Sequence, residues 1–144
     1  AGVAAFLAAA NLAKSEMREE KNRSLRLRQQ LINGLQELPY EIIFEGDPEH
    51  VLPQVLGLRI KGMEGQYAML ECNRHGLAIS TGSACSAGTE KASETMVALG
   101  RDEQETREFI RLSLGKQTTE DDISKALEII EKVLTEHFEM VKLK

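Results

Sequence analysis

The segment AISTGSACSAGT, residues 78–89, sets one cysteine, Cys85, among small side chains. Beyond Ile79 it contains no residue larger than threonine, so it offers no apolar shell in which a thiol would be buried. A nucleophilic cysteine has to be both accessible and ionised, and at an ordinary pKa of about 8.5 only a few per cent is thiolate at neutral pH. The surroundings of Cys85 therefore predict an accessible, reactive thiol, although a free cysteine is more often a small buried hydrophobe.

Arg111 is the second side chain with recognisable chemistry. It lies in the apolar run FIRLSL, residues 109–114, where strand alternation puts Ile110 and Leu112 on one face and Arg111 on the other. Such an arginine extends into solvent, unless its face lines a cleft. In a cleft, the planar guanidinium can bind a carboxylate through two hydrogen bonds. The residues alone leave both interpretations open.

The remaining cysteine and the histidines predict no metal site. Cys72 lies in a segment with helical spacing, and we expect it to be structural. Cys72, His75 and Cys85 form at most an incomplete set of ligands, because a structural zinc ion takes four and no convincing fourth is present. His50 and His137 have no evident partners in the sequence, and we expect both at the surface.

The elements that must position Cys85 and Arg111 follow from periodicity. Helical spacing of apolar residues runs from Val3 to about Asn33, and Asn33-Gly34 supplies a stop signal. Short apolar runs predict strands within residues 40–46, 53–62, 76–80 and 109–114. Further helices are predicted at residues 63–74 and 93–99, and from Thr118 towards the end of the chain, where Thr119 and Asp122 resemble a capping box. This order predicts an α+β fold, a small antiparallel or mixed sheet with helices on one face.

Composition narrows the classes of function. The 144 residues are 42% hydrophobic, which is enough for a real core, and their net charge of −5 comes from interspersed charges that disfavour nucleic acid as a partner. Two cysteines at unrelated spacing, without a signal peptide or a span of membrane length, indicate a reducing, cytoplasmic setting. The chain opens on Ala1 in what reads as a helix interior, so we expect a piece of a longer protein.

Four segments together resemble a known family. They are STGSACSAG at 80–88, ALG at 98–100, IRLSLGKQTTEDDI at 110–123 and the H-x-LP pattern at 50–53. In this order they are similar to the C-terminal part of the NifS-like cysteine desulfurases, pyridoxal-phosphate enzymes of the class V aminotransferase group. The resemblance extends over nearly the full chain.

The resemblance implies a definite activity for the parent enzyme. Such enzymes convert L-cysteine to L-alanine and transfer the sulfur to a loop cysteine as a persulfide, and Cys85 matches that cysteine. Arg111 matches the arginine that holds the substrate carboxylate. The family also implies a homodimer and a sulfur-acceptor protein as partner, such as an iron–sulfur scaffold or a thiolation enzyme.

The resemblance also implies that parts are missing. The family's cofactor-binding lysine and most of its phosphate ligands lie upstream of the matched region, and no lysine here falls in a matching motif. We therefore expect a long interdomain helix, residues 1–34, and a small C-terminal domain, residues 35–144, that alone neither binds pyridoxal phosphate nor turns over cysteine. Two departures remove no reacting group: Gln54 stands where the family usually has asparagine, and CSAG stands for the common CTSG or CSSG.

Two other classes of function remain open. A stand-alone sulfur-relay or docking module would use the same Cys85 without being an enzyme. A scaffold domain would carry Cys85 as an inert residue.

Overall fold

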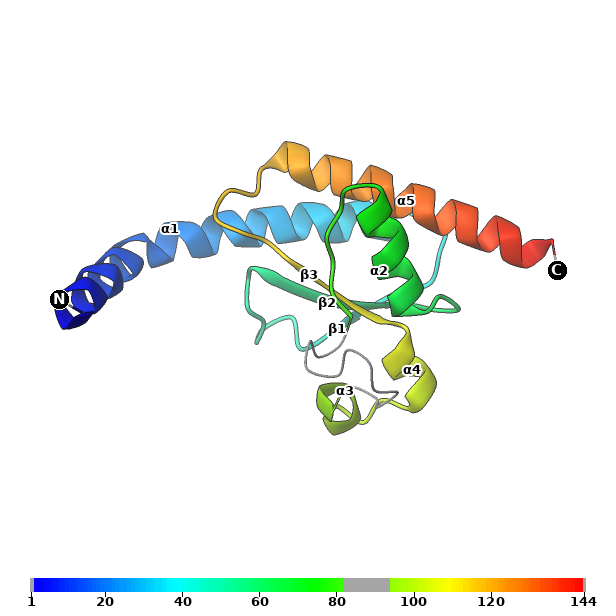
Figure 1. Ribbon diagram of the computed structural model, residues 1–144, viewed down its shortest axis with the longest axis horizontal. Helices are drawn as coiled ribbons and strands as arrows, with labels where there is room; N and C mark the ends of the chain where they lie inside the picture. Colours follow the sequence, from blue (N-terminus) through cyan, green and yellow to red (C-terminus); the bar gives the residue numbers. More distant parts are fainter. Residues whose placement is uncertain (1, 82–93, 144) are drawn as a thin grey trace.

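The computed structural model describes residues 2–81 and 94–143. Its strands form one antiparallel sheet in the order β1-β2-β3: β1 (Ile42–Glu45), β2 (Val55–Ile60) and β3 (Phe109–Ser113). The described helices, drawn in Figure 1, are α1 (Gly2–Gln36), α2 (Gly65–Arg74), α3 (Glu94–Ala98), α4 (Glu103–Arg107) and α5 (Glu120–Lys142).

One face of the sheet is apolar and carries the core. Leu58 lies opposite Phe44 of β1 and Ile110 of β3, so these side chains share a face. The three longer helices, α1, α2 and α5, cover it, and α1 and α5 lie side by side (Figure 1). Leu31 of α1 and Leu134 of α5 are fully buried in this core, where each such side chain contributes roughly 1.5–3 kcal/mol.

The first helix is longer than the sequence predicts. It passes through Asn33-Gly34 and ends at Gln36, so the expected stop there is wrong. Gly34 lacks the positive φ of a helix-ending glycine, and a Cβ at this position would collide with the side chain of Leu127 on α5. The glycine therefore serves the close approach of α1 to α5 instead of ending the helix.

The opposite face of the sheet, called the polar face below, carries Glu45, Arg59 and Arg111 beside the apolar Ile43, Val55 and Phe109, and α4 contacts it. Glu105 of α4 pairs with Arg59 of β2, so the expectation of helices on one face holds only for the three long ones. Helix α4 was not predicted from the sequence, although Asp102 and Glu105 form a capping box that marks its start. The capping box expected at Thr119 and Asp122 is confirmed at the start of α5.

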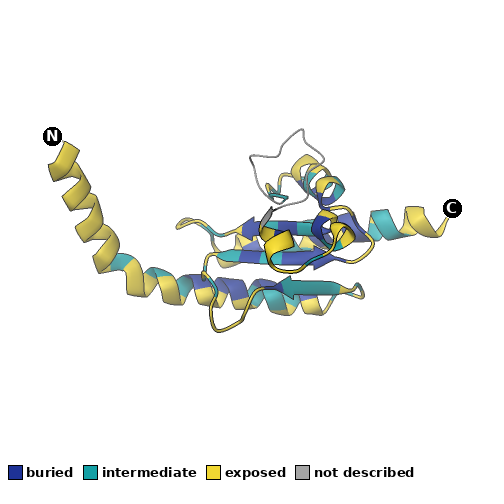
Figure 2. Ribbon diagram, turned by 90° about the horizontal axis from the view of Figure 1, so that it is seen from below, coloured by how far each residue is buried: buried dark blue, intermediate teal, exposed yellow. Residues whose placement is uncertain are grey.

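The first half of α1 extends away from the sheet. Figure 2 shows its residues exposed, and they include Val3 and Phe6, with 76% and 72% of their surfaces accessible. Within residues 2–81 and 94–143, no helix combines the length and hydropathy needed to cross a membrane.

Candidate functional site

Arg111 lies on the polar face of the sheet and is half-buried. It sits opposite Gly57, which in turn lies opposite Glu45 of β1. Because Gly57 has no side chain, the ring of Phe109 can lie over it, and a Cβ at position 57 would approach that ring to 2.9 Å. The face around Arg111 is therefore shaped by a glycine and an aromatic ring from neighbouring strands.

A backbone bridge joins Arg111 to Ser80 on the outer side of β3. The amide of Arg111 donates to the carbonyl of Ser80 at 2.7 Å, and the amide of Ser80 donates to the carbonyl of Arg111 at 3.0 Å. Nη2 of Arg111 also lies 3.5 Å from the Ser80 hydroxyl, which is a weak hydrogen bond. The predicted strand at residues 76–80 is thus reduced to a single bridge.

The bridge places the start of the cysteine-bearing segment beside Arg111. Thr81 is the last residue described before position 94, so Cys85 lies outside the described residues. Within the described ranges, no aspartate or glutamate pairs with Arg111. Its guanidinium can therefore donate hydrogen bonds to the carboxylate of a ligand.

The carboxylate of Glu45, on the same face, is already bound to two arginines. Its Oε1 accepts a hydrogen bond from Nε of Arg59, and its Oε2 lies 2.8 Å from Nη2 of Arg101. Arg59 also pairs with Glu105 of α4 at 2.9 Å. Burial by itself would lower the pKa of Arg59, but the hydrogen bond and charge of Glu45 hold it above its ordinary value. The group stays charged although only 5% of Arg59 is exposed.

This ion network binds the chain to the sheet again after α3. Arg101 and Glu105 follow residues 82–93 in the chain, and both bind charged groups on β1 and β2. Ser80, on the near end, is bound to β3. The chain is therefore bound to the same sheet before the segment that carries Cys85, at Ser80, and again after α3, at Arg101 and Glu105.

Cys72 behaves as the sequence predicts. Only 2% of it is exposed, and burial, followed by the negative charge of Glu71, raises its pKa to about 11. At neutral pH this thiol is almost entirely protonated and has no access to a reactant. Cys72 is therefore a structural residue of α2.

The two histidines expected at the surface differ. His50 is exposed and pairs with Asp47 at 2.7 Å. His137 is half-buried, stacks near Tyr67 and places Nε2 3.1 Å from the carbonyl of Gly62. His137 thus has partners that the sequence did not reveal, because contacts between α5 and residues far away in the sequence are not visible in local patterns.

Comparison with known proteins identifies the family. The family described as aminotransferase class-V matches residues 1–126. The chain belongs to the class V aminotransferase family. Among its members, the putative cysteine desulfurase NifS of Bacillus subtilis (strain 168) is 43% identical over 128 residues, which are 88% of this chain and 32% of that protein.

Other members of the class V aminotransferase family give the same result. Cysteine desulfurase IscS of Photorhabdus laumondii is 36% identical over 121 residues, 84% of this chain and 29% of that protein. A solved structure of a NifS-like protein superimposes with a TM-score of 0.74 at 25% identity, covering 86% of this chain and 30% of that one. The chain spans about a third of the length of the curated relatives it matches.

The described residues do not fit the cofactor that this family implies. A pyridoxal-phosphate site needs a lysine directed into a pocket and groups that favour a phosphate. Every lysine described is exposed: Lys14, Lys21, Lys61, Lys116, Lys125, Lys132 and Lys142. A cavity of about 580 Å³ lies between α4 and the β2–α2 turn, and its charged lining is mainly acidic: Glu64, Asp102, Glu103 and Glu108, with Arg107. A second cavity, of about 380 Å³ beside Leu31, has no cationic side chain in its lining.

The comparisons confirm the resemblance to class V aminotransferases but test neither Cys85 nor Arg111 as a site residue. Sequence reasoning missed Ser80 and the Glu45–Arg59 pair. Charged residues inside the apolar runs IIFE and VLGLRI were the available signal for the pair. Ser80 gave none, because its role depends on pairing with a strand about 30 residues later.

Proposed function

We propose that this chain is the C-terminal domain of a cysteine desulfurase, whose whole form converts L-cysteine to L-alanine and transfers the sulfur to Cys85 as a persulfide. The observation that carries the proposal is the bridge between Ser80 and Arg111. It joins a guanidinium without an ion-pair partner among the described residues to the start of the segment that bears Cys85. Relatives named as cysteine desulfurases support the reaction.

Arg111 and Cys85 have separate tasks in this proposal. Arg111 binds the carboxylate of L-cysteine and so orients the substrate thiol. The Cys85 thiolate attacks the substrate sulfur, a sulfur–sulfur bond forms, and the carbon–sulfur bond breaks. The carbon retains the bonding electron pair and gains a proton, which yields alanine. Four residues lie between Ser80 and Cys85, and this length limits their α-carbons to a separation of about 18 Å.

The wider organisation is part of the same proposal. Residues 1–34 connect this domain to a larger one, and residues 35–144 are the small domain. The exposed apolar side chains Val3, Phe6 and Leu7 on α1 support this, because they require a covering surface. The larger domain holds pyridoxal phosphate, the enzyme is a cytoplasmic homodimer, and a sulfur-acceptor protein receives the persulfide sulfur.

One experiment compares the whole protein with the isolated chain. Each is incubated with pyridoxal phosphate and L-cysteine, alanine is quantified, and the peptide containing Cys85 is weighed by mass spectrometry. We expect alanine, and a peptide heavier by one sulfur atom, only from the whole protein. If the isolated chain formed alanine at enzyme-like rates, the proposal that the cofactor lies in a separate, larger domain would be refuted. If the whole protein formed no alanine, the proposed desulfurase activity would be refuted.

A sulfur-relay module is the second candidate, favoured by the lack of a cofactor site among the described residues. Such a module would accept sulfur on Cys85 from a persulfide donor without any upstream domain. The isolated chain would then gain one sulfur atom from that donor and pass it to an acceptor. If Cys85 and Cys72 instead reacted equally slowly with a thiol reagent, an inert scaffold would be indicated.

Replacing Arg111 by lysine is expected to lower kcat/KM for L-cysteine roughly ten- to a hundredfold, mainly through a higher KM. Lysine keeps the charge but cannot make the two parallel hydrogen bonds, and hydrogen bonds to charged groups contribute about 1.5–3 kcal/mol. Arg107→Lys is the matched control, since Arg107 is exposed and pairs only with Glu103 in the described structure. Equal kinetics for the two variants would exclude Arg111 as the carboxylate-binding residue.

A further inference from the structure

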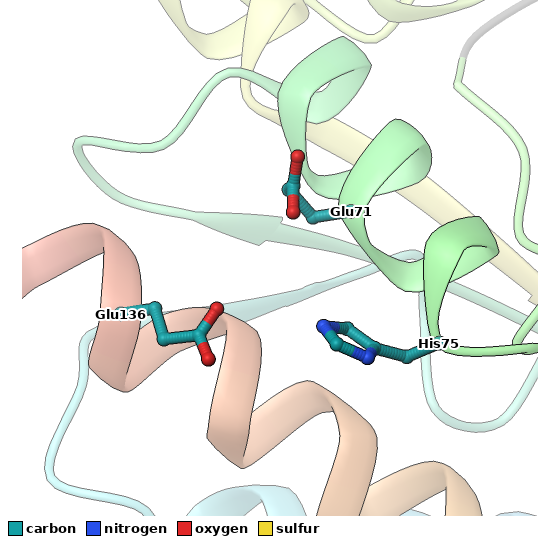
Figure 3. Close-up of side chains that lie close together, drawn as sticks. All are labelled: Glu71, His75 and Glu136. Carbon is teal, nitrogen blue, oxygen red and sulfur yellow. The ribbon is translucent and has the colours of Figure 1, made fainter.

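Three side chains with metal-binding atoms meet where α2 lies against α5. These helices cover the apolar face of the sheet, opposite the face that carries Arg111. Glu71 lies on α2, His75 is its C-cap residue, and Glu136 lies on α5. Figure 3 shows the His75 ring and the Glu136 carboxylate pointing toward one another, with the Glu71 side chain beside them. We propose that these three residues bind one divalent transition-metal ion of the zinc type, a site that does not depend on the proposed function.

Only small movements of the three side chains would bring their ligand atoms to the distances found around a zinc ion. The three ligand atoms all lie within 4.8 Å of one another. Around a tetrahedral zinc ion with bonds of about 2.0–2.1 Å, ligand atoms are roughly 3.3 Å apart. The donors would therefore approach by on the order of 1 Å, which glutamate side chains at a half-buried and an exposed position can provide by rotation.

The positions of the ligands are set by local and tertiary structure. Glu71 and His75 are four residues apart, so they lie on the same face of one helical turn, the spacing by which two helical residues commonly hold zinc. Glu136 is brought to them by contacts between α2 and α5. Next to Glu136, His137 packs against Tyr67 of α2 with ring centroids 5.0 Å apart. This packing fixes the spacing of the two helices at the site.

The donor set suits zinc-type ions better than calcium or magnesium. One imidazole nitrogen and two carboxylates are ligands typical of Zn²⁺, whereas the hard cations prefer oxygen alone. The two carboxylates also balance the charge of a divalent ion. The negative charges of both glutamates reach the neighbouring Tyr67: burial raises the pKa of Tyr67 most, and Glu71 and then Glu136 raise it further. Three protein ligands leave a fourth position for water.

Arg74 competes with the ion for Glu71. Its Nη1 lies 2.9 and 3.1 Å from the two Glu71 carboxylate oxygens, while 72% of the Arg74 side chain is exposed. Exposed ion pairs of this kind contribute about 1 kcal/mol or less, so the ion can displace the guanidinium. Removing Arg74 should therefore tighten metal binding, an effect that a structural role of the three residues would not produce.

The test is a titration of the 144-residue chain with Zn²⁺ against a chromophoric competitor. The chain carries Cys85→Ser, which removes that thiol as a competing ligand. We expect one equivalent to bind, and Glu71→Gln and His75→Ala each to weaken binding more than about tenfold, because even lost outer-shell partners cost that much. Glu131→Gln is the matched control, an exposed glutamate on the same helix as Glu136, and should leave the affinity unchanged.

Cobalt(II) supplies the second measurement. We expect visible d–d bands from nitrogen and oxygen ligands without a thiolate-to-metal charge-transfer band, and an affinity a few-fold higher in Arg74→Ala. The circular dichroism of each variant shows whether the fold is kept, and Glu136→Gln repeats the test at the most exposed ligand. Equal affinity in the ligand variants and Glu131→Gln, or a thiolate band, would overturn the site.

Discussion

Replacing Cys85 by serine in the whole enzyme is expected to reduce sulfur transfer from L-cysteine to an acceptor by at least about a thousandfold, as is usual when a nucleophile is removed. A serine hydroxyl is not ionised at neutral pH and cannot form the sulfur–sulfur bond that the persulfide requires. Binding of L-cysteine should persist, because Arg111, the proposed ligand of its carboxylate, is unchanged. The measurements are alanine and acceptor-bound sulfur per minute, together with the mass of the peptide that contains position 85.

Cys72 provides the control within the same chain. Its burial and its pKa of about 11 keep it protonated and out of contact with reactants. Cys72→Ala should therefore leave sulfur transfer within about twofold of the unmodified enzyme, apart from a modest loss of stability from the smaller side chain. Full activity in Cys85→Ser, or a comparable loss in Cys72→Ala, would show that Cys85 does not carry the sulfur.

The second large effect concerns stability. Replacing Glu45 by alanine is expected to lower the free energy of unfolding by about 3–5 kcal/mol, the cost of removing one partner from a buried ion pair. Arg59, which is 5% exposed, would lose the carboxylate bound to its Nε, and Arg101 would lose its partner at 2.8 Å. Urea unfolding of the isolated chain, followed by circular dichroism, measures the difference.

Glu41→Ala is the matched control for this substitution. Glu41 immediately precedes β1 and pairs with Lys61 at 2.9 Å, but about 58% of its side chain is exposed. An exposed pair of this kind contributes about 0–1 kcal/mol. If the two substitutions cost the same, the network around Glu45 does not hold β1 and β2 to the segment that begins at Arg101.

Features encoded locally could be predicted from the sequence. Strand alternation located β3 and placed Arg111 on the face opposite Ile110, and Thr119 with Asp122 marked the start of α5. The predicted end of α1 was wrong. Asn33-Gly34 has the residue types that commonly end a helix, but here the glycine is needed because α5 packs too closely for a side chain at position 34. A close approach between two helices cannot be distinguished from a turn signal in a single sequence.

Features that depend on pairing between distant segments could not be predicted. The Glu45–Arg59 pair requires the register of β1 against β2, and the Ser80 bridge requires the edge of β3 to be free. The family resemblance rested on short motifs and was confirmed, but the roles of Cys85 and Arg111 remain predictions. At the proposed metal site, the spacing of Glu71 and His75 was visible in the sequence, whereas Glu136 was not.

The anchoring of the chain at Ser80 and again at Arg101 has a consequence for evolution. The entropy of closing a chain between two fixed points grows slowly with length, by about 0.6 kcal/mol for each doubling. Insertions or deletions between Ser80 and α3, which leave the buried Met96 of that helix in place, should therefore cost little folding free energy, while they change how far a thiol can be delivered. Natural variation in the length of this stretch would then record the demands of different recipients of sulfur and not constraints from the core.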